Sequence, residues 1–214
     1  MKGFRFAGIA AGIKKKEGLR DLGLIVADTS CTGAALFTRN KVVAAPVILG
    51  KETVADGRLQ AILVNSGNAN CFTGEQGLDD AKTAVRQTAD ILGLSPDLVM
   101  VSSTGVIGQP LPMNKFESGI PMVAKALDTG TIEDFADAIL TTDTCSKIVR
   151  KTGQLPTDSG IKEFNIIGVA KGSGMIRPDM ATMLAYVLTD VTISTENLKS
   201  ALTQANNRSF NRIT

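Results

Sequence analysis

Short apolar segments bounded by Gly, Asp, Asn and Ser recur along the chain, and their content predicts β-strands. They are rich in Val, Ile and Leu, whose side chains fit a partly buried, pleated surface. We expect strands at residues 23–27, 34–38, 59–65, 98–102, 148–151, 164–170 and 183–191.

Longer segments carry apolar residues at helical spacing, which predicts α-helices with one buried face. In the clearest case, the apolar side chains that fall on one helix face are Ala81, Val85, Ala89 and Leu92. Thr131, followed three residues later by Asp134, resembles a capping box, and Ser194 or Thr195 could cap the last helix. The predicted helices span residues 78–92, 112–127, 132–140 and 196–205.

Gly, Asn, Ser and Thr gather at the ends of three predicted strands, at residues 65–70, 102–105 and 171–174. Loops at strand ends are where α/β folds tend to place functional groups. Strands and helices alternate along the chain, with no internal repeat or low-complexity tract. The expected architecture is therefore an α/β fold with sheets and helices in layers.

The composition is that of a folded globular protein. Of the 214 residues, 43% are apolar and 21% are charged, which supports a hydrophobic core in one large domain or two small ones. The formal net charge is +2, and the one dense basic run, residues 14–16, is typical of a solvated loop. With no broad basic stripe and only eight Phe and one Tyr for base stacking, we expect no nucleic-acid partner.

The chain shows no segment that resembles a membrane anchor or a secretion signal. Its apolar runs are far shorter than the ~20 residues of a transmembrane helix. Residues 1–12 include Lys2 and Arg5 but no long apolar region followed by a small-residue cleavage site. We therefore expect a cytoplasmic protein without a membrane partner.

Histidine is absent from the chain, and this narrows the possible chemistry. A Ser-His-Asp triad, a Cys-His pair and any metal site that depends on imidazole are excluded. Cys31, Cys71 and Cys145 are an odd, widely spaced set, typical of reduced side chains and not of a disulfide framework or a zinc site. Nucleophilic catalysis would need Lys, a carboxylate or a free α-amino group as its base.

Thr182 is a candidate nucleophile of this unusual kind. A Thr hydroxyl is weakly nucleophilic and needs an adjacent base. If the bond between Ala181 and Thr182 were cut, Thr182 would carry a free α-amine with a pKa of ~7.7–8.0, which could accept the hydroxyl proton. Composition alone predicts a strand residue here, so both interpretations remain open.

Three further segments have a functional and a structural interpretation. Residues 171–176 form a Gly-rich loop that could cradle a phosphate, but Lys171 precedes the glycines, so the loop lacks the P-loop pattern and could be a tight turn. At residues 103–108, backbone N–H groups and the Thr104 hydroxyl could form an oxyanion hole, or a simple turn. The polar residues 141–144 could end a helix or contact a polar amino-acid substrate.

Together, these segments resemble the ornithine acetyltransferase (glutamate N-acetyltransferase) family over essentially the whole chain and in the same order. The most specific match is the block from Lys171 to Leu184, with the runs Lys-Gly-Ser-Gly-Met-Ile and Met-Ala-Thr-Met-Leu. The other matching segments are residues 3–5, 10–14, 44–47, 65–70, 103–108 and 141–144.

The resemblance implies an α/β fold whose layered core is similar to that of the DmpA-type aminopeptidases. It implies that the precursor cleaves itself between Ala181 and Thr182 into an α and a β chain. Thr182 then takes the acetyl group from N-acetylornithine as an ester, and glutamate accepts it in the second half of a ping-pong cycle of arginine biosynthesis. No cofactor and no metal are implied, although acetyl-CoA is a possible further donor.

Site residues follow from matching positions. The resemblance implies that Thr104 and Gly105 are the oxyanion-hole pair and that Thr141, Lys171 and Thr182 bind substrate, with Thr182 also the nucleophile. Lys171, in a partly buried pocket, could neutralise a substrate carboxylate or tune the Thr182 amine.

The family polypeptide is considerably longer than this chain. The resemblance therefore divides the chain into an α-chain region, residues 1–181, and the start of a β-chain region, residues 182–214. It implies a heterotetramer of two α and two β chains, with further substrate contacts beyond Thr214. Two alternatives stay open: a self-processing hydrolase similar to the aminopeptidases, and an inactive, uncleaved fragment.

Overall fold

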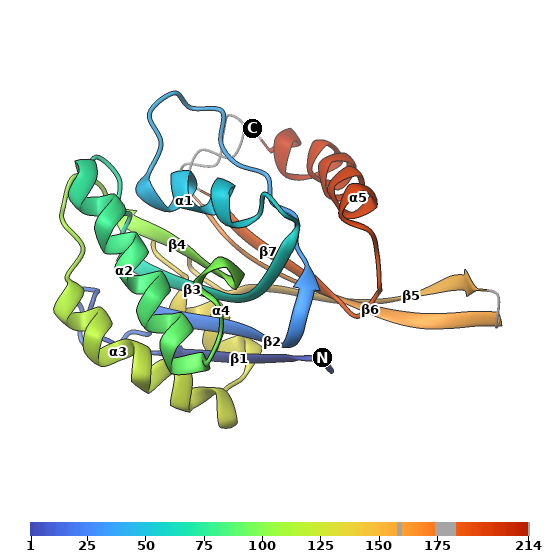
Figure 1. Cartoon of the computed structure of the whole chain (residues 1–214), viewed down its shortest axis with the longest axis horizontal. Coiled ribbons are helices and arrows are strands. Elements are labelled where there is room, and N and C mark those ends of the chain that lie inside the picture. The colour runs from blue at the N-terminus through green and yellow to red at the C-terminus, as the bar shows by residue number, and fades with distance from the viewer. Residues whose placement is uncertain (158–159, 174–182, 214) are drawn as a thin grey trace.

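The computed structural model describes residues 1–157, 160–173 and 183–213, whose strands form two sheets (Figure 1). One sheet has four strands in the order β1-β2-β3-β4, and the other has three in the order β5-β6-β7. The strands are β1 (Phe4–Ile9), β2 (Leu22–Thr32), β3 (Arg58–Asn68), β4 (Val99–Val106), β5 (Lys147–Thr157), β6 (Gly160–Lys171) and β7 (Leu184–Thr189). The α-helices are α1 (Ala45–Thr53), α2 (Gly74–Leu92), α3 (Met113–Lys125), α4 (Ile132–Ala138) and α5 (Thr195–Arg208).

The four-stranded sheet contains one parallel pair, and this pair organises the site. Strands β1, β2 and β3 are antiparallel neighbours, whereas β3 and β4 run parallel and are connected through α2. The crossover brings the carboxyl ends of β3 and β4 to the same edge. There Ser66 pairs with Thr104 and Gly67 with Gly105, so two sequence clusters lie side by side.

Each face of the four-stranded sheet is covered by a different layer. One face packs against α2 and α3 through buried side chains such as Leu63, Val85 and Phe116. The other face packs against α4 and the three-stranded sheet, where the rings of Phe135 and Tyr186 meet edge to face with centroids 5.5 Å apart. Helix α4 contacts strands of both sheets, and the result confirms the expected layered α/β architecture (Figure 1).

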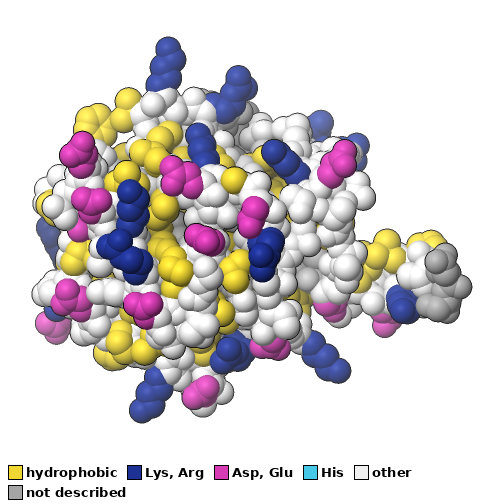
Figure 2. All heavy atoms as spheres, in the orientation of Figure 1, with side chains coloured by type: hydrophobic (Ala, Val, Ile, Leu, Met, Phe, Trp, Pro, Cys, Tyr) yellow, Lys and Arg dark blue, Asp and Glu magenta, His cyan; other side chains and the backbone are white. Residues whose placement is uncertain are grey.

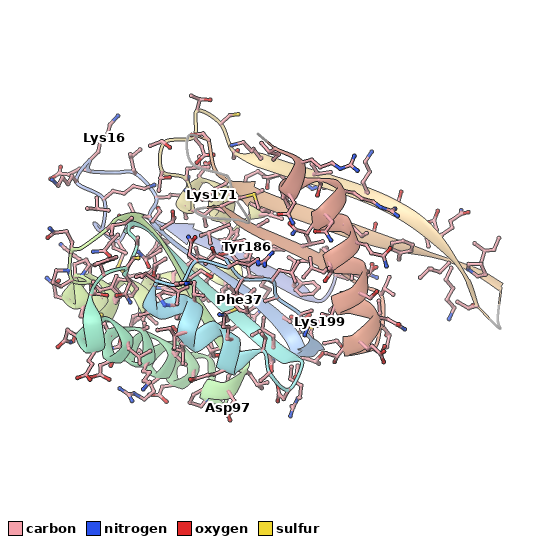
Figure 3. The ribbon with its side chains drawn as sticks, turned by 90° about the horizontal axis from the view of Figure 1, so that it is seen from above. Lys16, Phe37, Asp97, Lys171, Tyr186 and Lys199 are labelled. Carbon is pink, nitrogen blue, oxygen red and sulfur yellow. The ribbon has the colours of Figure 1, made fainter. Side chains whose placement is uncertain are left out.

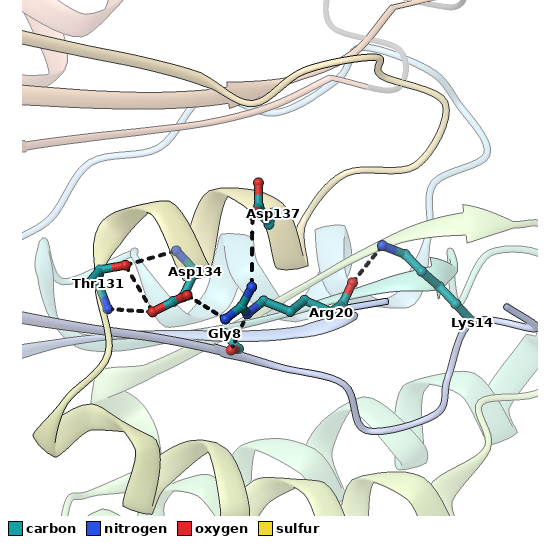
Figure 4. Close-up of polar contacts among 6 residues, drawn as sticks. All are labelled: Gly8, Lys14, Arg20, Thr131, Asp134 and Asp137. Carbon is teal, nitrogen blue, oxygen red and sulfur yellow. Dashed lines mark hydrogen bonds and ion pairs between the residues drawn. The ribbon is translucent and has the colours of Figure 1, made fainter. Parts of the chain in front are cut away.

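The helix predictions are confirmed, with small shifts at their ends. The capping box of α4 is present, because the N–H of Asp134 donates to Thr131 Oγ1 at 3.2 Å and the N–H of Thr131 donates to Asp134 Oδ2 at 2.9 Å (Figure 4). At α5 the N-cap residue is Ser194 and not Thr195, and Ser194 Oγ accepts the N–H of Asn197 at 3.3 Å.

Three local predictions differ from the structure. Residues 34–38 form no strand, because their apolar content packs on α1; a Cβ on Gly50 of that helix would lie 3.2 Å from a ring carbon of Phe37. Helix α1 was not predicted, since its N-cap Ala44 makes no side-chain cap, although Pro46 in the first turn is a favourable start. Strand β1 was also missed; it pairs antiparallel with β2 along its whole length, a tertiary contact that its own sequence does not reveal.

The hairpin of β5 and β6 projects beyond the other elements, and the space-filling view shows hydrophobic side chains along it (Figures 1 and 2). Leu155 and Ile161 are among the exposed apolar residues of this hairpin. Within the part of the chain that the structure describes, no helix is long and apolar enough to cross a membrane.

Candidate active site

Gly105 allows β3 and β4 to approach each other closely at the edge where the polar clusters meet. Its φ is +140°, a conformation that side-chain-bearing residues rarely adopt. A Cβ at this position would lie 2.3 Å from the carbonyl carbon of Gly67 and 2.5 Å from the backbone nitrogen of Asn68. The pairing register is irregular at the same point, so the backbone of Gly105 is set directly against the β3 segment.

Lys171, the last residue of β6, reaches across to this edge (Figure 3). The residue is 4% exposed, and its Nζ donates to Thr104 Oγ1 at 3.0 Å and to Thr141 Oγ1 at 2.6 Å. Three of the predicted site residues, from β4, from the segment after α4 and from β6, therefore meet at one ammonium group.

The described residues use only two of the three hydrogen-bond donors of this ammonium group. An ammonium has three N–H donors, and the two Thr hydroxyls use two of them. Burial is the largest cause that lowers the pKa of Lys171, and the Lys147 and Lys14 ammonium groups lower it further. The carboxylate of Asp143 opposes them by raising it. The third N–H is available to an acceptor supplied from outside the described residues.

Thr104 keeps a donor of its own. Thr104 is only 3% exposed, and its Oγ1 accepts a hydrogen bond from Lys171 Nζ. Because an ammonium can only donate, the hydroxyl proton of Thr104 remains available to another acceptor. The arrangement can thus place one hydroxyl donor beside one cation, which is suited to an anionic group.

The segment that carries Thr141 is positioned by two contacts at α4. Ser66 Oγ donates to the carbonyl oxygen of Ala138 at 2.5 Å, and so satisfies one of the free carbonyls at the helix end. Arg20 pairs with Asp134 at 2.6 Å and donates to the carbonyl of Gly8 at 3.0 Å, which connects α4 to β1 (Figure 4). These contacts fix the chain just before Thr141.

Asn residues at the end of β3 build the neighbouring loop. Asn65 Nδ2 donates to the carbonyl of Asn68 at 2.8 Å, and Asn68 Oδ1 accepts the N–H of Asn70 at 2.8 Å. Asn70 Nδ2 donates to the carbonyl of Gly77 in α2 at 2.8 Å. All three Asn side chains are buried, and these hydrogen bonds join them to backbone groups, so this part of the motif fixes the loop.

Asp21 is a structural residue of the site that sequence reasoning missed. It is completely buried, and its two carboxylate oxygens accept backbone N–H groups from Ala11, Ile13 and Lys14 at 2.7, 2.6 and 2.9 Å. This fixes residues 10–14 against Gly67, whose added Cβ would lie 3.1 Å from Lys14 Cγ. Its sequence signal was weak, since an Asp before a predicted strand is common in exposed turns.

The two residues of the predicted cleavage site, Ala181 and Thr182, lie outside the described residues. The described chain resumes at residue 183, and Leu184 of β7 pairs with Lys171 of β6. Thr104, Gly105, Thr141 and Lys171 are thus described, whereas the predicted nucleophile is not.

Other features of the surface lie apart from these residues. A hollow of about 360 Å³ between α2 and α3 is lined by Gln87, Asp90, Ile91, Glu117, Ile120 and Pro121, and shares no residue with the site. Across residues 1–157, 160–173 and 183–213, no three Cys, Asp or Glu side chains gather in a way that could bind a metal ion.

Comparison with curated proteins gives relatives along the whole chain. "Arginine biosynthesis bifunctional protein ArgJ" of Geobacter sulfurreducens is 46% identical over 214 residues, which are 100% of this chain and 53% of the relative. The protein of the same name from Streptococcus mutans is 46% identical over 213 residues, or 99% of this chain and 51% of the relative. The chain therefore spans about half the length of the curated relatives it matches.

Solved structures show the same fold. The ArgJ structure of Bacillus halodurans has a TM-score of 0.73 and 42% identity, with 84% of this chain covering 92% of that chain. Ornithine acetyltransferase of Mycobacterium tuberculosis, solved with ornithine, has a TM-score of 0.73 and 37% identity, with 84% of this chain covering 93% of that one.

A more distant structure confirms the expected aminopeptidase-like fold. The L-aminopeptidase D-Ala-esterase/amidase of Ochrobactrum anthropi, described as a variant of the Ntn hydrolase fold, has a TM-score of 0.53. It covers 100% of this chain and 68% of its own length at 14% identity, so it shows the fold alone. The ArgJ family model matches residues 5–214, and with relatives this similar along its whole length the chain belongs to the ArgJ family.

Proposed function

We propose that this chain is the N-terminal part of a glutamate N-acetyltransferase, which moves the acetyl group of N-acetylornithine to glutamate in arginine biosynthesis. The observation that carries the proposal is the buried ammonium of Lys171, which donates to Thr104 and Thr141 and has a third N–H without a partner among the described residues. The relatives are named for arginine biosynthesis, and a neighbouring structure is an ornithine acetyltransferase solved with ornithine, which supports an acetyl transfer that involves ornithine.

The free N–H of Lys171 suits the carboxylate of an amino acid. A buried ammonium with an unused donor is costly, and a carboxylate oxygen would provide a charge-assisted hydrogen bond. N-acetylornithine and glutamate both carry an α-carboxylate, so one cation can serve both halves of the reaction. Thr141, which is exposed, lies where a substrate could enter.

Thr104 and Gly105 supply the proposed donors to the reacting acyl oxygen. When a nucleophile adds to the acetyl carbonyl, its oxygen becomes negatively charged, and fixed N–H and O–H donors stabilise that charge. Lys171 donates to the Thr104 oxygen, so the Thr104 hydroxyl can itself donate to the acyl oxygen, and the backbone N–H of Gly105 follows directly in the chain. The close approach of β3 at Gly67 leaves little freedom for this backbone to move.

Thr182 is the proposed nucleophile, and cleavage between Ala181 and Thr182 is the proposed source of its base. The Thr182 oxygen attacks the acetyl carbon while its proton passes to the new α-amine, and ornithine then leaves with a proton on its amine. Glutamate's amine attacks the resulting acetyl ester, so N-acetylglutamate is released and the Thr hydroxyl is restored. Leu184, two positions after Thr182 in the sequence, pairs with Lys171, which supports this arrangement.

The lengths of the relatives support a two-chain enzyme. The curated relatives are nearly twice as long as this chain. The solved ArgJ chain of Bacillus halodurans is shorter than these relatives, since 84% of this chain aligns with 92% of that chain. The proposal thus includes an α-chain region at residues 1–181, a β chain that begins at residue 182, and a heterotetramer of two of each. A cytoplasmic location and acetyl-CoA as an additional donor belong to the same proposal.

The test uses protein from the complete gene, with Thr182→Ala beside the wild type and Thr203→Ala as a matched control on α5. Intact mass should show wild type and Thr203→Ala split between Ala181 and Thr182, and Thr182→Ala whole. The split proteins should transfer acetyl from N-acetylornithine to glutamate and carry one acetyl group on the peptide that begins at Thr182.

Each alternative predicts a different result. A hydrolase similar to the aminopeptidases would split and release acetate or amino acids without forming N-acetylglutamate. An inactive fragment would stay whole under folding conditions and carry no acetyl group. Either outcome would reject the acetyltransferase proposal.

A further inference from the structure

Residues 171–173 leave β6 alongside residues 141–143, and a polar side chain of the second segment contacts each residue of the first. The three contacts are Lys171 Nζ to Thr141 Oγ1 at 2.6 Å, the Gly172 N–H to Asp143 Oδ1 at 2.8 Å, and the hydroxyls of Thr142 and Ser173 at 3.0 Å. The end of β6, from which Lys171 reaches the site, is therefore positioned by a segment 29 to 31 residues earlier.

Asp143 is the charged member of this contact. Its side chain is completely buried, and its Oδ1 accepts from Lys147 Nζ at 2.5 Å as well as from the Gly172 N–H. Gly172 has a φ of +144°, so the backbone leaves β6 in a conformation suited to glycine, and Asp143 fixes that conformation. Oδ2 has no hydrogen-bond partner among the described residues.

A buried carboxylate needs a reason to stay ionised. Burial by itself raises the pKa of Asp143, but the hydrogen bonds from Lys147 and from the Gly172 N–H outweigh it, and the pKa is lowered. The charge of Lys171 also contributes to this lowering. Asp143 therefore remains an anion next to the cation of the site.

The charges around Lys171 show what Asp143 contributes. Among the described residues, Lys147 and Lys14 disfavour the ammonium form of Lys171. Within the same set, Asp143 is the group that favours it. Without Asp143, a buried ammonium would face two further cations, and β6 would lose the hydrogen bond at Gly172.

We propose that Asp143 is a positioning residue that fixes the exit of β6 at Gly172 and so holds Lys171 between Thr104 and Thr141. The inference rests on the proposed function for its catalytic consequence, since Lys171 is there the group that binds the substrate carboxylate. In this proposal Asp143 acts through the backbone of Gly172 and through Lys171.

The experiment compares Asp143→Asn with Asp190→Asn in protein from the complete gene. Asp190 is a matched control, because it also accepts a backbone N–H, from Asn165 at 2.7 Å, but at the other end of the β6–β7 pairing. Lysines labelled with ¹³C at the ε carbon report the titration of Lys171, whose signal is assigned by its absence in Lys171→Arg. kcat and KM for N-acetylornithine are measured on the same proteins.

Asp143→Asn should lower the pKa of Lys171 relative to wild type and reduce kcat/KM by roughly 10- to 100-fold, mainly through KM, since a misplaced binding group loses orientation. Asp190→Asn should leave both unchanged. An unchanged Lys171 titration and KM in Asp143→Asn would overturn the proposal. If Asp143→Asn does not fold, Asp143→Glu is measured in its place. This variant keeps the negative charge, so Lys171 should titrate as in the wild type. A shifted Lys171 titration in Asp143→Glu would contradict the proposal.

The titration separates this inference from the proposed function. If wild type transfers no acetyl group, the proposed function fails, yet a lowered Lys171 pKa in Asp143→Asn still supports the positioning role. If wild type is active and Asp143→Asn titrates and reacts as wild type does, the positioning role fails while the proposed function stands.

Discussion

Lys171 Nζ and Thr141 Oγ1 lie 2.6 Å apart, although 30 positions separate the two residues in the chain. Thr141 follows a helix that packs between the sheets, and Lys171 ends a strand of the smaller sheet. Their hydrogen bond therefore joins the segment after α4 to the smaller sheet, and the second bond of Lys171, to Thr104, joins the smaller sheet to the larger one. The relationship makes the site sensitive to changes in any of its three supporting segments.

Lys171→Met should raise KM for N-acetylornithine by roughly 10- to 100-fold, because a charge-assisted hydrogen bond to a carboxylate is worth about 1.5–3 kcal/mol. Steady-state kinetics on protein from the complete gene measures this effect. Lys199→Met, at an exposed position of α5, is the control and should leave KM unchanged. An equal KM in both variants would mean that Lys171 does not bind the substrate.

The pH dependence of KM should reveal the same ammonium group. Burial lowers the pKa of Lys171, so it loses its proton at a lower pH than an ordinary lysine. Carboxylate binding requires the charged form, and KM should therefore rise as the pH increases through that lowered value. Lys171→Arg stays charged over the whole range and should lack this alkaline rise even if its affinity is weaker. The same rise in Lys171→Arg would assign it to another group.

Gly105→Ala should destabilise the fold by about 3 kcal/mol or more, because a methyl group must fit 2.3 Å from the backbone of Gly67 at a positive φ. Denaturant unfolding of the protein gives this difference in free energy. Gly168→Ala in β6 is the control, since an added Cβ there meets no atom within 4 Å, and its effect should stay within about 1 kcal/mol. Equal effects would contradict the close approach of β3 and β4.

Asp21→Asn should cost about 3 kcal/mol of unfolding free energy. The new NH₂ group would face backbone N–H donors of Ala11, Ile13 and Lys14 inside a buried site. The control is Asp56→Asn, where an exposed carboxylate accepts the N–H of Arg58 at 3.0 Å, and it should cost less than about 1 kcal/mol. Thermal unfolding at neutral pH tests both variants, and a neutral effect of Asp21→Asn would reject the anchoring role.

The stabilisation of the fold by Asp143 should decrease as the pH falls into the acid range. Its pKa is lower in the folded chain than the ordinary value of 3.8, so its stabilisation is complete above that value and is lost as the pH falls through the folded value. The difference in unfolding free energy between wild type and Asp143→Asn should therefore be constant at neutral pH and shrink in acid. A difference that stays constant throughout the acid range would show that the charge of Asp143 does not stabilise the fold.

The contacts that support the site explain why local sequence patterns were insufficient to find all of it. The Thr131 capping box and the apolar face of α2 depend on residues three or four positions apart, and both were predicted. The segment 34–38 has strand-like composition but no partner strand, and its Phe37 packs on α1 instead. Strand propensity reflects how well side chains pack against a neighbouring strand. It therefore produces no strand where the fold places no neighbouring strand.

The sequence by itself determined the helical periodicity, the layered α/β class and the motifs by which the chain resembles its family. It also marked Thr104, Gly105, Thr141 and Lys171, because they lie in the segments by which the chain resembles its family. Only the tertiary structure decided that the hydroxyls of Thr104 and Thr141 both accept hydrogen bonds from the ammonium group of Lys171.

The supporting roles of Ser66, Asp21 and Asp143 were likewise decided by the tertiary structure. Each acts through hydrogen bonds to backbone groups, and a backbone group carries no residue-specific signal in the sequence. Ser66 and Asp143 act on partners 72 and 29 positions away, and Asp21 fixes a loop 7 to 10 positions before it. Such contacts exist only once the packing of sheets and helices has brought the segments together, which is why the sequence alone could not reveal them.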